Sequence, residues 1–186
     1  MLLNRASVSE LQDPAPAGPD LDMILQAGLR APDHGKLRPW RFVLIRGAAR
    51  AAWAETIVAA QISREPDAPE AVIEKQRRRV LNAPLIIALG AKLRHGHKIP
   101  EIEQMLSVGA AAMNMLNAIH ALGYGGVWLT GANSFDPRVV TALGLEPTDK
   151  LAGFLFVGTP KALPLTTRRP TVDEHTIEWQ GEPAVA

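Results

Sequence analysis

The chain has 186 residues, a length that favours one compact domain over residues 1–186 and allows a core without disulfides or structural metal. It contains no cysteine, which excludes thiol nucleophiles, thiolate metal sites and disulfides. Twenty Lys and Arg against 19 Asp and Glu leave a net charge of +1, which argues against a dedicated nucleic-acid surface. Residues 1–14 lack the basic segment and apolar run of a secretory signal, so we expect a cytoplasmic protein.

Helical and strand patterns alternate along the chain. In chain order, the periodicity and the turn residues predict a helix at 20–29, a strand at 40–45, helices at 48–62 and 68–81, a strand at 85–89, a helix at 100–122, a strand at 126–130, a helix at 137–143 and a strand at 153–157. This alternation favours a layered fold in which helices cover both faces of a central sheet. It leaves open whether neighbouring strands are parallel.

The stretch 104–135 has no charged residue, although the composition of the chain predicts about seven in 32 positions. Its first part is apolar on nearly all sides and resembles either a buried helix or a membrane span. Gln104, Ser107 and Asn114 interrupt the run, and Gly123 ends it too early for a span, so we expect a long central helix of the core and no membrane segment. The small residues 109–112 would allow a partner subunit to approach closely.

Several common catalytic patterns are missing. The chain has no GxxxxGK[ST] phosphate loop, no GxSxG elbow and no HExxH pair, and the GYGG run at 123–126 lies between a helix and a strand, the reverse of a dinucleotide-binding turn. His95 and His97 could share a metal, but an exposed loop is the favoured interpretation and we expect no metal. The absence of a self-sufficient nucleophile favours a borrowed cofactor or no catalysis.

Three segments nevertheless have the composition of binding sites. The run NRASVS at 4–9 offers an Arg and two hydroxyls, which suit an anion such as phosphate. Its alternative interpretation is a helix cap with a solvated side chain. In the loop that follows the helix 20–29, Arg30 and His34 lie close enough to converge on one ligand. Alternatively, Arg30 neutralises a helix C-terminus and His34 makes a loop hydrogen bond.

The third segment is WLTG at 128–131, at the end of a strand. A Trp there is usually a core residue. A strand end that leads into TGANS would also direct backbone amides and the Thr130 hydroxyl outward, as the edge of a flat ligand requires.

Together these segments resemble the nitroreductase-like flavoproteins, and among them the short NAD(P)H nitroreductases of the bacterial type. The resemblance covers nearly the whole chain. NRASVSELQDPAP is similar to the family's opening segment, LRAPDHGKLRPWRFVLI to its loop and first strand, HKIPEIEQMLSVGAA to the entry of its long helix, and GYGGVWLTG to its flavin-edge strand.

The resemblance implies an α+β fold, bound FMN, and a homodimer with two flavin sites built from both subunits. It also implies hydride transfer from NADH or NADPH to a small-molecule acceptor such as a nitroaromatic or a quinone. By position, the residues that would contact the FMN are Arg5, Ala6 and Ser7 at the phosphate and ribityl end, Arg30 and His34 against the flavin, and Trp128, Leu129 and Thr130 from the strand. Arg30 would stabilise the negative charge of the reduced ring, and His34 or a water could deliver protons.

The chain departs from the family pattern at its N-terminus. Ala6 replaces the second arginine of the opening segment, which removes one cation and places more of the phosphate binding on Arg5 or on a tail residue. Arg168 and Arg169 resemble a basic pair that such proteins place at the phosphate, with Arg168 preferred.

Two other functions stay open at this stage. One is a non-catalytic dimer that binds flavin or another small ligand. The other is a family relative that dehydrogenates or dehalogenates a specific substrate. The sequence identifies neither the acceptor nor the preferred nicotinamide cofactor.

Overall fold

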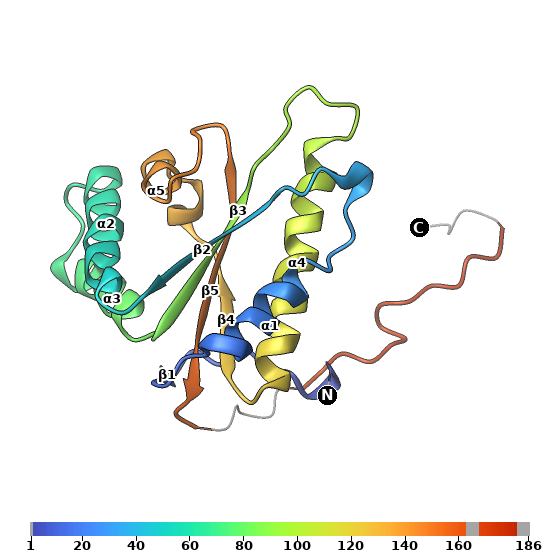
Figure 1. Ribbon diagram of the computed structural model, residues 1–186, viewed down its shortest axis with the longest axis horizontal. Helices are drawn as coiled ribbons and strands as arrows, with labels where there is room; N and C mark the ends of the chain where they lie inside the picture. The colour runs from blue at the N-terminus through green and yellow to red at the C-terminus, as the bar shows by residue number, and fades with distance from the viewer. Residues whose placement is uncertain (1, 163–167, 182–186) are drawn as a thin grey trace.

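The computed structural model describes residues 2–162 and 168–181 (Figure 1). In chain order, the elements are η1 (Leu2–Asn4), β1 (Leu11–Gln12), α1 (Gly18–Gly28), η2 (His34–Lys36), β2 (Trp40–Arg46), α2 (Ala49–Arg64), α3 (Glu70–Leu81), β3 (Leu85–Ala91), α4 (Glu101–Ala121), β4 (Gly125–Leu129), η3 (Ala132–Phe135), α5 (Pro137–Ala142) and β5 (Lys150–Pro160). Every helix and strand expected from the sequence is present, with ends shifted by a few residues.

The described strands form one five-stranded sheet in the order β1-β5-β3-β2, and β4 pairs with β5 off this path. All pairings are antiparallel, which settles the direction that the sequence left open. Between β2 and β3 the chain passes through two helices, α2 and α3, which return it to the end of the sheet that it left. Arg46 at the end of β2 therefore faces Leu85 at the start of β3.

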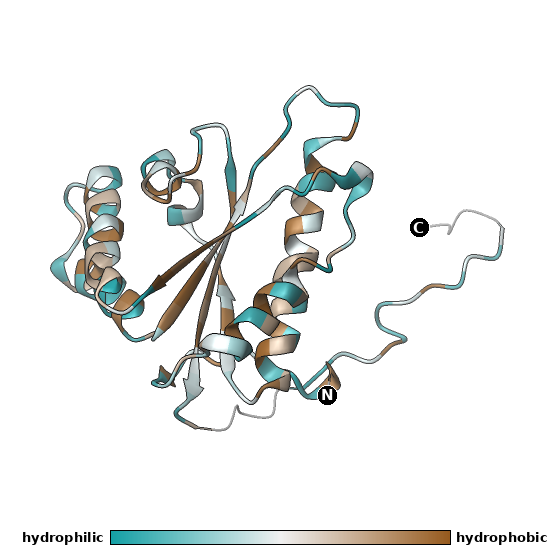
Figure 2. Ribbon diagram, in the orientation of Figure 1, coloured by the Kyte–Doolittle hydropathy of each residue, from teal (hydrophilic) through white to brown (hydrophobic). Residues whose placement is uncertain are grey.

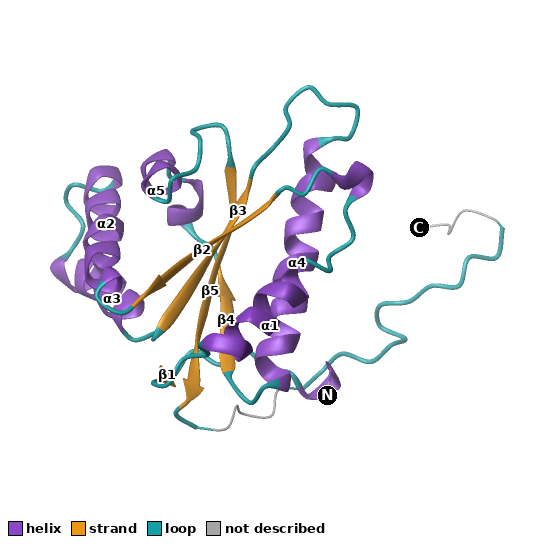
Figure 3. Cartoon of the chain, viewed as in Figure 1, coloured by secondary structure: helices purple, strands orange, loops and turns teal. Residues whose placement is uncertain are grey.

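Helices cover both faces of the sheet, as the sequence predicts (Figure 3). The apolar residues of β3 alternate between the faces, because successive side chains of a strand point in opposite directions. Ile86 and Ala88 belong to a core with α2 and α5, whereas Leu85, Ile87 and Leu89 belong to a second core with α1 and α4. The brown strands between the two helical layers in Figure 2 mark this apolar centre.

Helix α4 is buried along one side only. Val108, Ala112 and Met115 are fully buried against the sheet and α1. On the opposite side, Ile102 and Leu106 are each 65% exposed and Met113 is 40% exposed. The single chain therefore encloses only one side of this helix. No helix in the described part of the chain has the length and apolarity that crossing a membrane requires.

Two features of the sheet go beyond the expected elements. The short strand β1 pairs with the end of β5, and β5 extends beyond the expected range 153–157 in both directions. Strand β4 ends at Leu129, so Thr130 is the first residue after the strand.

Candidate functional site

The N-terminal segment lies beside the start of β4. The backbone N–H of Val8 donates to the carbonyl of Gly126 at 3.1 Å, which fixes the residues just before Val8 at the edge of the sheet. Arg5 and Ala6 are half-buried and Ser7 is exposed. The Nη1 atom of Arg5 is buried and has no hydrogen-bond partner among the described residues. Because a buried guanidinium nitrogen is costly to leave unpaired, its placement suits an incoming anion.

The tail returns to this segment. Nη2 of Arg169 donates to the backbone carbonyl of Arg5 at 2.8 Å. The sequence favoured Arg168 as the tail cation; Arg168 and Arg169 are both exposed, and Arg169 makes this contact. The structure therefore brings the basic pair to the predicted segment, and the choice of Arg168 as the phosphate ligand stays a prediction.

Strand β4 divides its side chains between the two faces of the sheet. The Trp128 ring packs in the core with α1 and α4, and its Nε1 donates to the carbonyl of Ala152 at 2.8 Å. Leu129 packs in the opposite core. The side chains of Trp128 and Leu129 therefore lie on opposite faces of the sheet. Leu129 and Thr130 line one cavity, and Trp128 does not contribute to its lining.

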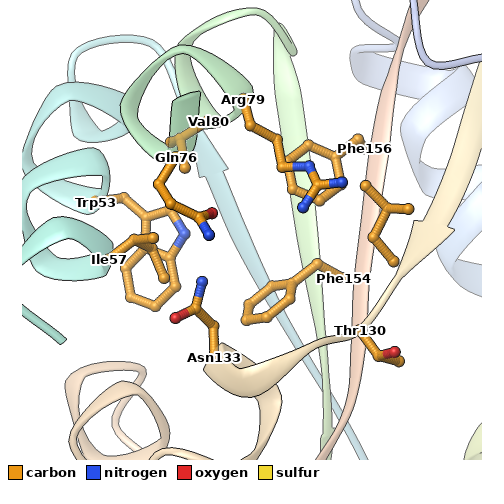
Figure 4. A pocket seen from close by; sticks show the side chains of 10 residues that line it. Trp53, Ile57, Gln76, Arg79, Val80, Thr130, Asn133, Phe154 and Phe156 are labelled. Carbon is orange, nitrogen blue, oxygen red and sulfur yellow. The ribbon is translucent and has the colours of Figure 1, made fainter. Parts of the chain in front are cut away.

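That cavity, of about 30 Å³, opens between α2, α3 and the end of β4 (Figure 4). Its apolar lining comes from Trp53, Ile57, Val80, Leu129, Phe154 and Phe156, and its polar lining from Gln76, Arg79, Thr130 and Asn133. The volume is too small for a ring system but suits the edge of one. Figure 4 shows Gln76 and Asn133 in the space between the helices and the sheet, and the Arg79 side chain extending from α3 toward Phe156.

Sequence reasoning missed Gln76 and Arg79. Arg79 is exposed and makes no ion pair or side-chain hydrogen bond to any described residue, so its charge is free for a ligand. A signal was present, because Gln76 lies three residues after Ile73 and four before Val80, on the buried face of α3. Polar side chains on the core-facing side of a helix are candidates for a site.

A polar network holds the loop after β4 from behind. Arg64, at the end of α2, forms a salt bridge with Asp136 and donates through Nη2 to Oδ1 of Asn133 at 2.6 Å. The Asp136 side chain is 2% exposed and also accepts from the backbone N–H of Arg138 at 2.9 Å. Since Asn133 lines the cavity, this network fixes one of its walls.

Asp136 stays charged within this network. Burial raises the pKa of its carboxyl, but the hydrogen bonds from Arg138 and Arg64, together with their positive charges, outweigh burial and lower the pKa below its ordinary value. The carboxylate therefore neutralises Arg64 at neutral pH.

Residues 20–34 run antiparallel along α4, as three contacts show. The Tyr124 hydroxyl, just after α4, donates to Asp20 at 2.9 Å, the Ser107 hydroxyl donates to the carbonyl of Pro32 at 2.8 Å, and Nδ1 of His34 lies 2.6 Å from Oε2 of Glu103. His34 is thus held at the N-terminal end of α4. Arg30 is exposed and lines a shallow groove between α1 and α4 with Asn114 and Asn117.

The predicted segments do not all meet within one chain. Gly126, which anchors the Arg5 segment, packs against Leu116, whereas His34 contacts Glu103. These two positions of α4 are about 20 Å apart along the helix axis at its usual rise of 1.5 Å per residue. Within one copy of the chain, the Arg5 segment and His34 therefore lie toward opposite ends of α4.

His95 and His97 lie in a loop, as the sequence favoured. Nδ1 of His95 lies 2.7 Å from Oε1 of Glu101, and Nδ1 of His97 accepts from the backbone N–H of Ile99 at 3.1 Å. Within residues 2–162 and 168–181, no group of three or more His, Asp or Glu side chains is arranged to hold a metal.

The family model for the nitroreductase family matches residues 2–159. The chain belongs to the nitroreductase family. An Escherichia coli K12 protein named "Putative NAD(P)H nitroreductase YdjA" is 42% identical to this family member over 161 residues, or 87% of each chain. A Haemophilus influenzae protein named "Putative NAD(P)H nitroreductase" is 32% identical over 86% of each chain.

Solved structures share the fold of this nitroreductase-family chain. A nitroreductase-like family protein from Bacillus cereus matches with a TM-score of 0.82 and 22% identity, over 97% of this chain and 94% of its own. A nitroreductase from Desulfovibrio desulfuricans, described as putative and as a complex with FMN, matches with a TM-score of 0.75 and 26% identity, over 96% and 94% of the two chains. The expected α+β fold is therefore confirmed.

Proposed function

We propose that this protein is an FMN-dependent oxidoreductase that passes hydride from NADH or NADPH to an organic acceptor such as a nitroaromatic or a quinone. The observation that carries the proposal is the buried, unpartnered Nη1 of Arg5 beside the start of β4. The names of the E. coli and H. influenzae relatives and the FMN of the D. desulfuricans complex support it.

Each described side chain has a distinct role in holding the cofactor. Arg5 would bind the phosphate, with Ser7 and a tail arginine beside it. Leu129 and Thr130 would contact the ring from the end of β4. Arg79, over the cavity of Figure 4, would stabilise negative charge at the edge of the ring, the role that sequence analysis assigned to Arg30. Bound FMN would supply a ring that accepts hydride from nicotinamide and reduces the acceptor.

A homodimer would complete the site. His34 and the Arg5 segment lie toward opposite ends of α4 in one copy, so a second copy could present its His34 near the Arg5 segment of the first. A two-fold axis that pairs the α4 helices antiparallel would bring the His34 end of one copy to the Arg5 end of the other. His34 and Arg30 would then act on the partner's flavin, and His34 or a water would deliver protons to the acceptor.

The exposed side of α4 supports this assembly. Ile102, Leu106 and Met113 form an apolar strip that a single chain leaves open to solvent. Small residues between them, Gly109 and Ala110, would let a second backbone approach. Obligate dimers bury apolar surfaces of this kind, because they resemble a core divided between two chains.

The experiment is an anaerobic titration of purified protein. We expect co-purifying FMN, identified by mass spectrometry, whose absorbance bleaches on addition of NADH or NADPH. Arg5→Ala should weaken FMN binding to the apoprotein by about 1.5 to 3 kcal/mol, the usual scale for a hydrogen bond to a charged group. That is roughly a tenfold to a hundredfold loss of affinity.

Arg46→Ala is the matched control, because it removes an exposed arginine at the far end of β2 and should leave FMN affinity unchanged. Bound FAD, or no flavin after expression with excess riboflavin, would remove the cofactor assignment. Flavin that binds but does not bleach with either nicotinamide would leave a binding protein without this activity.

A further inference from the structure

The loop between α1 and β2 lines a second, larger pocket of about 480 Å³ that is open to solvent. It is lined by Leu29, Ala31, Asp33, Lys36, Arg38 and Trp40. In Figure 1 this loop lies between α1 and β2, beside the N-terminal end of α4. The volume falls within the usual range for small-molecule sites, which are mostly apolar with a few placed polar groups.

The pocket combines an apolar floor with cations that are free to bind. Leu29, Ala31 and Trp40 provide the apolar surface. The side chains of Lys36 and Arg38 are exposed and make no ion pair or hydrogen bond to any described residue. The single acid in the lining, Asp33, is held in the loop, because its Oδ2 accepts from the backbone N–H of Arg38 at 2.8 Å, and its negative charge is outnumbered by the two cations.

The backbone holds both cations in an unfavourable conformation. Lys36 has φ +55° and Arg38 has φ +51°, in the left-handed region that a side chain disfavours. Arg38 also precedes Pro39, which restricts its backbone further. The strain at Arg38 is maintained from both sides, because Asp33 binds its N–H and Nη1 of Arg41 donates to its carbonyl at 3.2 Å. Strain of this kind gathers at ligand-binding sites, where surrounding contacts impose it.

We propose that this pocket binds the 2′-phosphorylated adenosine of NADPH, so that Lys36 and Arg38 select NADPH over NADH. A phosphomonoester carries about −1.5 to −2 charges at neutral pH, which a lining of two cations and one acid with a net positive charge attracts. The apolar floor would receive the purine. The adenosine of NADH lacks this phosphate and would gain nothing from the second cation. The proposal rests on the proposed function, because His34, in the same η2 turn as Lys36, is there assigned to a flavin site.

The test is calorimetric titration of the purified, flavin-loaded protein with 2′,5′-ADP, with 5′-AMP and with inorganic phosphate. We expect 2′,5′-ADP to bind at least about tenfold more tightly than either of the others, on the scale of a charge-assisted contact. Lys36→Asn and Arg38→Asn should each weaken 2′,5′-ADP by about tenfold. Asparagine tolerates a positive φ better than other side chains, so these variants remove the charge with little change in the loop.

Arg46→Asn is the matched control and should bind 2′,5′-ADP as the unmodified protein does. Equal affinity for 2′,5′-ADP and 5′-AMP, equal affinity for phosphate alone, or unchanged binding in both loop variants would overturn the proposal. Protein that bleaches with NADH and NADPH at similar KM and ignores 2′,5′-ADP would lose this inference and keep the proposed function. Protein without flavin that still prefers 2′,5′-ADP would support the pocket while the proposed function fails.

Discussion

Gly153 lies where β5 passes the end of β4, and the site depends on its lack of a side chain. Its φ is +120°, and an added Cβ would lie 2.5 Å from the carbonyl oxygen of Leu129 and 2.8 Å from Nε1 of Trp128. The same atom would lie 2.9 Å from Cγ2 of Thr130. Gly153→Ala would therefore push against three consecutive residues at the strand end that lines the cavity.

The size of the effect follows from separate terms. A side chain at a sparsely populated φ costs about 1 to 3 kcal/mol. Overpacking against backbone that cannot move freely adds roughly 1 to 3 kcal/mol. Displacing the Trp128 indole would also weaken its hydrogen bond to Ala152, worth about 1 kcal/mol. We expect Gly153→Ala to lower the free energy of unfolding by about 3 to 5 kcal/mol, since these terms overlap.

Gly131→Ala is the matched control, because Gly131 has φ +102° and nothing within 4 Å of an added Cβ. Gly131→Ala should lower the free energy of unfolding only by the cost of the positive φ, because its methyl group contacts no other atom. Urea unfolding of both variants measures the difference, and near-ultraviolet circular dichroism reports the Trp128 environment. Equal destabilisation of the two variants would refute the close approach of β5 to the end of β4.

Three other perturbations test separate parts of the molecule. Arg79→Gln should make the midpoint potential of the bound flavin more negative by about 30 mV, the equivalent of about 1.4 kcal/mol for two electrons; an unchanged potential by spectroelectrochemistry would exclude Arg79 from the ring edge. Leu106→Glu should give monomers that lose FMN, as measured by analytical ultracentrifugation. The control variant Ile62→Glu, on the exposed surface of α2, should stay dimeric. A flavin-loaded monomer of Leu106→Glu would contradict the shared site. Because the pKa of Asp136 is lowered by folding, its carboxylate stabilises the native state above the ordinary value of about 4 and loses this contribution as pH falls through the lowered pKa. In acid unfolding, the free energy of unfolding of the unmodified protein should exceed that of Asp136→Asn by less and less below about pH 4. A difference that grows as the pH falls would contradict a lowered pKa of Asp136.

Short-range patterns determined the elements and two of the candidate segments. The continuous apolar run at 85–89 is typical of a strand covered on both faces, and all of β3 is buried. Pro100 and Pro137 marked helix starts, because proline fits the first turn and cannot continue a preceding helix. Residue type and sequence neighbours also predicted binding roles for Arg5 and Thr130, which stay predictions. These features depend on contacts within a few residues of one another.

Tertiary structure decided which of these segments meet. Gln76 and Arg79 join Thr130 only because α3 packs over the end of β4, more than 50 positions later in the chain. Trp128 and Leu129 are neighbours in sequence, yet the strand directs them to opposite cores. The length of α4 separates His34 from the Arg5 segment, although both have the composition of a binding site. The type of a residue determines what its side chain can bind. The long-range packing of helices against the sheet determines which side chains lie within reach of one ligand.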